Sequence, residues 1–349
     1  MKGTSDNLSE SRLYAESVRF SGDTLKPNLQ SQFDSSDFNA FLALNNLHVT
    51  SLITPIISKC IDNVTGNLKI PSSAVTTYVY ASKDLNASCT AGNDVECIIQ
   101  LSSGLIDILE DDELEFVIGH ELGHFLYSHS LTEGQSDNEN LEFFSQKRAQ
   151  EFSADRIGLL SSGDLNASVR AMMKVNSGLS SKHLKFNVGE FISQLSRTED
   201  LVMPSNFQPT HPPILVRCRA LLWFASNKDD YSTSEIEKID KKIQKDIDKY
   251  VDPAVIEIIK ELKDSVKLWL SASLIIEDGR FDKNEQEQFE KSFGKDKLEK
   301  FKVFISSPNA KMNVAKKLEF SIHHLSLEIP SSIDTEMESI EKEVRTNFV

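Results

Sequence analysis

The sequence ELEFVIGHELGH, residues 113–124, is the most informative part of this chain, because it places two histidines four positions apart. On an α-helix, positions i and i+4 share a face, so the rings of His120 and His124 can reach one zinc ion. Glu121 follows His120 directly, where its carboxylate can reach a water on the metal without being a ligand. This pattern predicts a metal-dependent hydrolase, and the alternative is a helix with two core or solvated histidines.

Two acidic residues further along the chain, Glu151 and Asp155, are again four positions apart. One of them can bind the metal while the other orients a ligand histidine through its second ring N–H. We take Glu151 as the third ligand, and the alternative is an exposed helix glutamate. Small residues on both segments indicate that the two helices pack closely, because glycine otherwise lowers helix propensity. They are Gly119, Gly123 and Ala154.

Composition restricts the classes of function. The 349 residues include 38 basic and 53 acidic side chains, a net charge of −15, which disfavours nucleic acid and anionic lipid as partners. No apolar stretch approaches the roughly 18 residues of a spanning helix, and the polar N-terminus lacks a secretory signal. We therefore expect a cytoplasmic protein whose four cysteines are reduced thiols, or disulfides only if an export signal has been lost or is unusual. They are Cys60, Cys89, Cys97 and Cys218.

Composition and charge density together divide the chain into three parts. Residues 1–37 are polar and predict a mobile N-terminal segment that tucks against the body. Residues 38–226 carry the motifs. Residues 227–349 hold charged side chains at about twice the earlier density, which predicts a helical C-terminal module with salt-bridged outer faces. We place the boundary between Asn227 and Ser234.

Hydrophobic periodicity predicts an α-rich α+β fold. Asp112 is the expected N-cap of the motif helix, with Glu115 completing a capping box, and this helix is expected to end near Ser130. The segment at residues 90–93 is expected to be a turn. The expected strands are 74–81 and 94–101, and the other expected helices near the motif are 141–161, 164–177 and 214–226.

With these motifs in place, the chain resembles the HtpX and CAAX-prenyl-protease family of zinc metallopeptidases. That family pairs its His-Glu-x-x-His helix with a downstream Glu-x-x-x-Asp helix, which matches RAQEFSADRIG at residues 148–158. The resemblance covers about residues 70–226. Further matching elements, in order, are Asn86-Ala87, Ser103-Gly104-Leu105, and Thr210-His211-Pro212 with Arg217. Many members are integral membrane proteins, so this chain looks closer to the soluble branch.

The resemblance implies a role for each matched residue. His120, His124 and Glu151 would bind one zinc ion, Glu121 would be the general base, and Asp155 would orient a ligand histidine through its second ring N–H. His211 is the candidate donor to the oxyanion, or alternatively a fourth metal ligand in a resting form. Arg217 would pair with Asp155 or a nearby carboxylate, and the alternative is a surface arginine.

The fold implied is a zincin-type metallopeptidase core with a small sheet beside the active-site helix, plus the helical C-terminal module. In peptidases of this plan the substrate adds as a strand to a sheet edge, which we expect within Asn86–Gln100. His129 lies about 140° round the helix from His124 and is expected at the surface. The remaining histidines have no ligand-spaced partner and are expected to be structural or exposed. They are His48, His183, His323 and His324.

The C-terminal module contains a helix–turn–helix segment around Asp278-Gly279. Asp282 is the expected N-cap of its second helix, with Glu285 at the capping-box position. This segment faintly resembles tellurite-resistance TerB-like domains, and the alternative is a helical hairpin that packs on the first part or binds a partner protein. It is not a calcium-binding EF-hand, because Leu274 and Ile276 stand where carboxylates are required.

The function expected from the sequence is a zinc endopeptidase that acts on protein or peptide substrates. The alternative is a non-catalytic or latent metal-stabilised scaffold whose C-terminal module binds a partner. Glu121 beside an intact ligand set argues against the scaffold, since a structural zinc is normally enclosed by four protein ligands.

Overall fold

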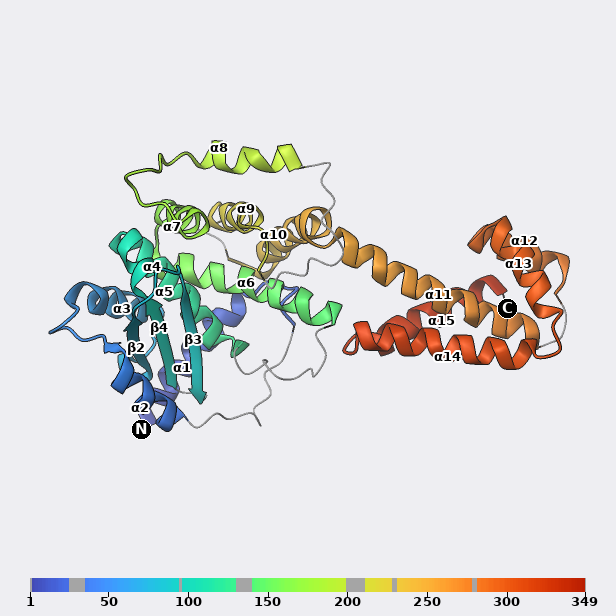
Figure 1. Cartoon of the computed structure of the whole chain (residues 1–349), viewed down its shortest axis with the longest axis horizontal. Helices are drawn as coiled ribbons and strands as arrows, with labels where there is room; N and C mark the ends of the chain where they lie inside the picture. Colours follow the sequence, from blue (N-terminus) through green and yellow to red (C-terminus); the bar gives the residue numbers. More distant parts are fainter. Residues whose placement is uncertain are drawn as a thin grey trace. The chain divides into compact units, whose positions relative to one another are not determined.

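The computed structural model describes residues 2–24, 35–93, 96–129, 140–198, 211–227, 231–277 and 281–348. Contacts within the chain define two compact units, which Figure 1 draws in sequence colours. Unit 1 extends to Val251, and unit 2 begins at Asp252 and also includes residues 140–144. The two units are described separately.

Unit 1 contains a four-stranded sheet in the order β1-β2-β4-β3. β2 and β4 are parallel, whereas β1 and β3 pair antiparallel with their neighbours, so β3 is an edge strand. The predicted strands at 74–81 and 94–101 are confirmed as β2 and β4. The prediction of a turn at residues 90–93 is wrong, because these residues form the C-terminal end of strand β3. The strands are β1 Leu47–His48, β2 Val75–Tyr80, β3 Ala87–Asn93 and β4 Glu96–Ser102.

Side chains alternate across β4 and divide the two faces of the sheet. Ile98 packs with Tyr78 against Leu42 of α2 (Ser35–Asn45). Ile99 and Leu101 point the other way, into the main core. The four cysteines are free, and the β3–β4 pairing brings the Sγ atoms of Cys89 and Cys97 within 2.9 Å of each other.

Most helices of unit 1 lie to one side of this sheet (Figure 1), and α2 packs on its other face. α5 carries the His-Glu-x-x-His motif and lies against β3, α3 and α7. The other helices of unit 1 are α1 Lys2–Ser17, α3 Pro55–Asn67, α4 Ser103–Ile108, α5 Asp111–Leu126, α6 Leu141–Ser162 from Ser145 onward, α7 Leu165–Ser177, α8 Val188–Ser193, α9 Ile214–Ala225 and α10 Thr233–Asp246. An α-rich α+β fold with a small sheet beside the motif helix is confirmed.

Both ends of α5 differ from the expectation. Glu110 is the N-cap, in place of Asp112, because the Glu113 carboxylate accepts a hydrogen bond from the Glu110 N–H at 2.8 Å. The helix ends at Leu126, short of Ser130. Asp164 is the N-cap of α7 (Leu165–Ser177), since its carboxylate accepts hydrogen bonds from the N–H groups of Asn166 and Ala167.

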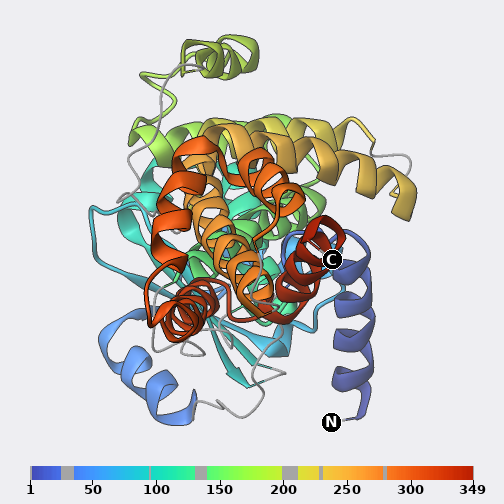
Figure 2. The same cartoon turned by 90° about the vertical axis from the view of Figure 1, so that its right-hand side faces the viewer.

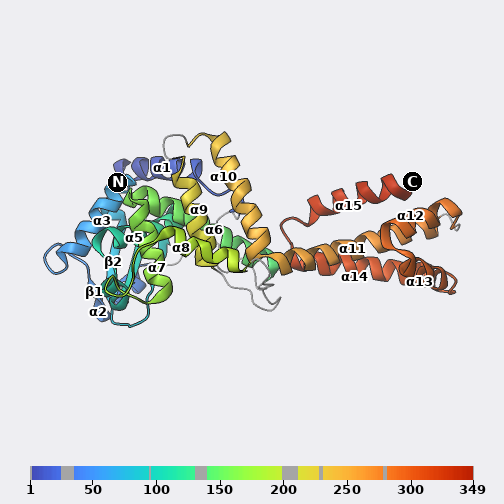
Figure 3. The ribbon, with the colours of Figure 1, turned by 90° about the horizontal axis from the view of Figure 1, so that it is seen from above.

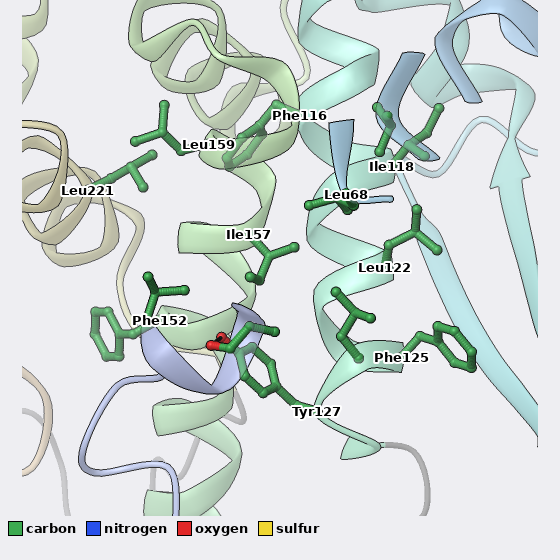
Figure 4. Close-up of a cluster of buried hydrophobic side chains, with 14 of the residues drawn as sticks. Leu68, Phe116, Ile118, Leu122, Phe125, Tyr127, Phe152, Ile157, Leu159 and Leu221 are labelled. Carbon is green, nitrogen blue, oxygen red and sulfur yellow. Dashed lines mark hydrogen bonds between the residues drawn. The ribbon is translucent and has the colours of Figure 1, made fainter. Parts of the chain in front are cut away.

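The close approach of α5 and α6 depends on the small residues noted in the sequence. A Cβ on Gly123 would lie 2.9 Å from the Cα of Ala154, and one on Gly119 would overlap Ser161. Such contacts are shorter than van der Waals separation, so only glycine permits this distance between the helices. Figure 4 shows the apolar side chains around this contact, among them Leu122 of α5 and Ile157 of α6.

The N-terminal segment, expected from its composition to be mobile and to tuck against the body, contributes buried side chains to the main core between residues 8 and 24. Leu8, Ala15, Val18 and Phe20 are all buried. The Tyr127 hydroxyl donates a hydrogen bond to the Ala15 carbonyl at 2.7 Å. The segment appeared too polar for this role because its few apolar residues are widely spaced. They nevertheless recur on one side of α1 and its C-terminal extension.

The main core also extends beyond the composition boundary near Asn227. α10 belongs to unit 1 by contacts, and Ile236, Ile239 and Ile243 are buried in its core. The charged residues of α10 raise the local charge density without separating the helix from the core. The domain limits inferred from composition stay a prediction.

Unit 2 is a set of helices that pack on the long helix α11. α14 and α15 lie alongside α11 (Figure 3), and Figure 2 shows the same helices after a turn of 90°, with α14 seen close to end-on. Apolar residues such as Val266, Phe289 and Leu325 are buried between the helices. The helices are α11 Pro253–Glu277, α12 Lys283–Phe293, α13 Lys295–Ile305, α14 Ala310–Glu328 and α15 Ile333–Phe348.

The second helix of the expected helix–turn–helix segment begins as predicted. The Asp282 carboxylate accepts from the Glu285 N–H at 2.9 Å, and Glu285 accepts from the Asp282 N–H at 2.8 Å. The turn at Asp278-Gly279 lies outside the described residues. Among the described helices, none combines the length and apolar composition that a bilayer crossing requires.

Candidate metal centre

Three predicted ligands from two helices meet in unit 1. The Nε2 atoms of His120 and His124 are 3.2 Å apart, and they lie 3.6 Å and 3.4 Å from the carboxylate oxygens of Glu151. Two donors bound to zinc at 2.0–2.1 Å with tetrahedral angles would be about 3.3–3.4 Å apart. Among the described residues, this is the group of His, Cys, Asp and Glu side chains whose spacing suits a metal ion.

Asp155 and Arg217 lie directly behind the three donors. Asp155 Oδ1 is 3.0 Å from His120 Nδ1, which leaves His120 Nε2 facing the other donors. Arg217 donates two hydrogen bonds to Asp155, at 2.9 Å and 2.7 Å, and its third nitrogen is 2.9 Å from Glu151. The structure thus places Arg217 against both buried carboxylates.

The charges of this cluster hold its carboxyl groups ionised. Burial alone raises the pKa of Glu151, but Arg217 and the two histidines outweigh it and hold that pKa well below its usual value. Burial also raises the pKa of Asp155, but the contacts with Arg217 and His120 outweigh burial and lower that pKa below its usual value. Burial disfavours the charged form of His124, yet the contact with Glu151 raises its pKa. The cluster therefore combines negative charge with imidazole nitrogens, a donor set suited to a divalent metal.

His129 is buried, which corrects its expected place at the surface. Its Nδ1 atom is 2.8 Å from His124 Nδ1, and its Nε2 atom is 3.0 Å from Asp23 Oδ2. The ideal-helix angle failed because α5 ends at Leu126 and Ser128 adopts a positive φ of 57°, which redirects the chain. Burial lowers the pKa of His129 to about 4, so this ring is neutral near pH 7.

A cavity of about 200 Å³ opens beside the metal ligands. Glu121 and His211 both line it, and its other walls are mainly apolar, with Leu105, Met172 and Val175 among them. His211 is largely exposed, and its Nε2 atom is 3.6 Å from a Glu151 oxygen. The sequence also predicts that prolines on both sides of His211 stiffen this loop, and one of them, Pro209, lies outside the described residues. The cavity brings the predicted base and the predicted oxyanion donor to the same space.

The variant Arg217→Ala is expected to lower the free energy of unfolding of the metal-free protein by about 3–5 kcal/mol, because Glu151 and Asp155 would remain buried without their cation. We expect a smaller loss for Arg217→Lys, which retains the charge without the paired geometry. Urea unfolding of the chelator-treated protein measures both. Arg197→Ala is the matched control, since its pair with Glu190 is exposed and should contribute no more than ~1 kcal/mol.

The pH dependence of the Arg217→Ala effect gives a second readout. Because folding lowers the pKa of Glu151 and Asp155, their contribution to stability is present above about pH 4.5 and is lost as the pH falls. The gap between parent and Arg217→Ala should therefore narrow in acid. A gap that is equal at pH 7 and pH 3.5 would contradict this account of the cluster.

Comparison with known proteins agrees with the geometry. The model of peptidase family M48 matches residues 51–144 and 136–224, which include the three metal donors, Glu121 and Arg217. The chain belongs to peptidase family M48. The resemblance to the HtpX and CAAX-prenyl-protease family of metallopeptidases, inferred from the sequence motifs, is thus confirmed at the level of family M48.

Three relatives show how far this similarity extends. The M48 chain is 41% identical over 64 residues to metalloprotease YcaL of Escherichia coli (strain K12), covering 18% of this chain and 24% of the relative. It is 34% identical over 93 residues to metalloprotease LoiP of the same organism, covering 27% and 33%. It is 32% identical over 79 residues to a protease HtpX homolog of Nostoc punctiforme, covering 23% and 27%.

The chain therefore spans a quarter to a third of the length of these relatives. No solved structure matches it at a significant level. The M48 match begins at residue 51 and ends at residue 224, so it includes neither Asp23 nor the helices of unit 2.

Proposed function

We propose that this M48 protein is a zinc-dependent endopeptidase that hydrolyses peptide bonds in protein substrates. The supporting observation is the group formed by His120, His124 and Glu151, whose donor atoms have the spacing of a zinc site beside a cavity lined by Glu121. The names of the relatives, metalloproteases and protease homologs, agree with this proposal.

His120, His124 and Glu151 would hold the ion. When bound, zinc supplies a Lewis acid that polarises a carbonyl oxygen and makes water more acidic. Asp155 accepts the Nδ1 proton of His120 and so keeps Nε2 of that ring unprotonated for the metal. Arg217 balances the negative charge of Asp155 and Glu151 and keeps both side chains in place.

Glu121 carries the proton in the proposed reaction. Its carboxylate takes a proton from water as the water oxygen bonds to the scissile carbonyl carbon. It then gives that proton to the amide nitrogen as the carbon–nitrogen bond breaks, so the products are a carboxylic acid and an amine. His211, across the same cavity, donates an N–H to the developing oxyanion.

The edge strand β3 provides a surface on which an extended substrate can pair. Asn86 and Ala87, at the start of β3, line the cavity beside Glu121. Backbone hydrogen bonds along this edge would bind a substrate with little choice of sequence. The apolar walls of the cavity, by contrast, favour an apolar substrate side chain next to the scissile bond.

The proposal is tested by metal removal and replacement. The full chain is treated with a chelator, divided, and assayed on casein with and without one equivalent of zinc. We expect hydrolysis only in the zinc-loaded sample, with internal fragments detected by mass spectrometry. Zinc-loaded protein that leaves casein intact, or that releases only terminal residues, would overturn the endopeptidase assignment.

The non-catalytic scaffold considered from the sequence is not favoured. A structural zinc is normally enclosed by four protein ligands, and the group found among the described residues supplies three. The cytoplasmic location, the partner protein for the C-terminal module and its TerB-like resemblance stay predictions from the sequence.

A further inference from the structure

A chain of buried polar side chains leads away from the second ligand histidine. His124 Nδ1 faces His129 Nδ1 at 2.8 Å, and His129 Nε2 faces Asp23 Oδ2 at 3.0 Å. His129 is 2% exposed and Asp23 is 3% exposed, so both contacts are shielded from solvent. None of the sequence motifs includes Asp23 or assigns a role to His129.

The direction of each hydrogen bond follows from the chemistry of the groups. The Asp23 carboxylate only accepts, so His129 Nε2 carries a proton and donates it. The 2.8 Å contact between the two Nδ1 atoms leaves room for one proton, and a His124 that binds the metal through Nε2 carries that proton on its own Nδ1, so His129 Nδ1 accepts. His124 Nδ1 is then the donor, and the unprotonated atom of His124 is Nε2. That atom faces His120 Nε2 and Glu151.

A buried carboxylate thus supports the Nδ1 atom of each ligand histidine, directly for His120 and through a second imidazole ring for His124. Asp155 contacts His120 Nδ1 directly. Asp23 reaches His124 Nδ1 through the ring of His129, which also stacks on Tyr127 with the ring centroids 5.3 Å apart. The hydrogen-bonded contacts that start at each ligand ring therefore end at a buried carboxylate, Asp155 or Asp23.

Several contacts fix Asp23 against the helices of unit 1. Arg19 Nε donates to Asp23 at 3.0 Å, and the Phe20 N–H donates to Ser153 Oγ at 3.2 Å. The Ser21 N–H donates to Asp240 of α10 at 2.9 Å. The segment before Asp23 is therefore held by both α6 and α10.

On the basis of the zinc site in the proposed function, we propose that His129 and Asp23 are positioning residues for the metal ligand His124. They fix its ring orientation and its tautomer, so the N-terminal segment completes a metal centre whose ligands all lie on α5 and α6. Outer partners of this kind typically change metal affinity by 10–100-fold when they are removed.

The test measures zinc affinity by competition with a chromophoric chelator, which does not depend on catalysis. His129→Ala and Asp23→Asn are expected to weaken zinc binding by about 10–100-fold. His129→Asn should restore most of the affinity, because its side-chain oxygen can accept the hydrogen bond from His124 Nδ1. His183→Ala is the matched control, since His183 is exposed and distant in sequence from the ligands.

Each result has a distinct meaning. Circular dichroism of the metal-free variants identifies any that fail to fold. If His129→Ala does not fold, the zinc affinities of His129→Asn and Asp23→Asn decide, because the first should stay near that of the parent and the second should fall. Zinc affinity within twofold of the parent in folded His129→Ala, or equal losses in His129→Ala and His129→Asn, would overturn the positioning role. Zinc binding that survives His120→Ala unchanged would instead overturn the proposed zinc site itself.

Discussion

Replacing Glu121 with Gln is expected to reduce casein hydrolysis by at least ~10²–10⁴-fold, the typical contribution of a positioned proton-transfer group. Gln has nearly the same size as Glu and keeps an oxygen that can accept a hydrogen bond, but it cannot take up a proton. Since Glu121 lines the cavity without belonging to the three-donor group, zinc content and fold should not change. Initial rates at equal zinc occupancy measure the effect.

Glu115→Gln is the matched control for this experiment. Glu115 lies on the same helix and accepts a hydrogen bond from Asn63, which a Gln oxygen can also accept. We expect the control to retain the activity of the parent. If Glu121→Gln also cleaved casein at the parent rate, the proposed mechanism would have to be abandoned.

Replacing His211 with Ala is expected to lower turnover by ~10²–10³-fold with little change in zinc affinity, as the loss of one oxyanion donor typically does. The ring lines the cavity with Glu121, yet it does not belong to the group of three donors. His211→Asn, which retains an N–H donor, should recover part of the rate. Steady-state kinetics on a quenched-fluorescent peptide, with zinc affinity measured in parallel, test this role.

Two other outcomes of the His211 experiment are informative. If His211 closes the metal site in a resting form, His211→Ala should raise the activity and weaken zinc binding. An unchanged rate with unchanged affinity would contradict both roles and leave His211 as an ordinary loop residue.

The part of the site that depends on local spacing could be predicted from the sequence. The two histidines of α5 and the Glu151–Asp155 pair of α6 are each four positions apart, and the helical repeat alone places such pairs on one face. The glycines predicted the close contact of these helices for a similar reason, because their helix propensity is poor unless packing requires them.

The long-range part of the site could not be predicted in this way. His129 follows a helix end and a residue with positive φ, so its direction does not continue the helical repeat. Its partner Asp23 is 106 positions earlier in the chain. A polar segment with few apolar residues gives no periodic signal for this contact, which depends on the burial of Val18 and Phe20.

The extent of unit 1 was hidden by charge density. α10 is rich in charged residues, but one face carries isoleucines at three- and four-residue steps that enter the main core. Local composition counts the exposed face as well, whereas packing depends only on the buried one. Periodicity was therefore a better guide to this helix than composition.

The most direct test of the proposed zinc site is the zinc content of the purified full-length chain, measured by mass spectrometry of the metal alongside the His120→Ala/His124→Ala double variant. The account predicts one zinc ion per parent chain and a loss of that zinc in the folded double variant. A double variant that retains one zinc per chain would contradict it, because the ion would then be bound elsewhere.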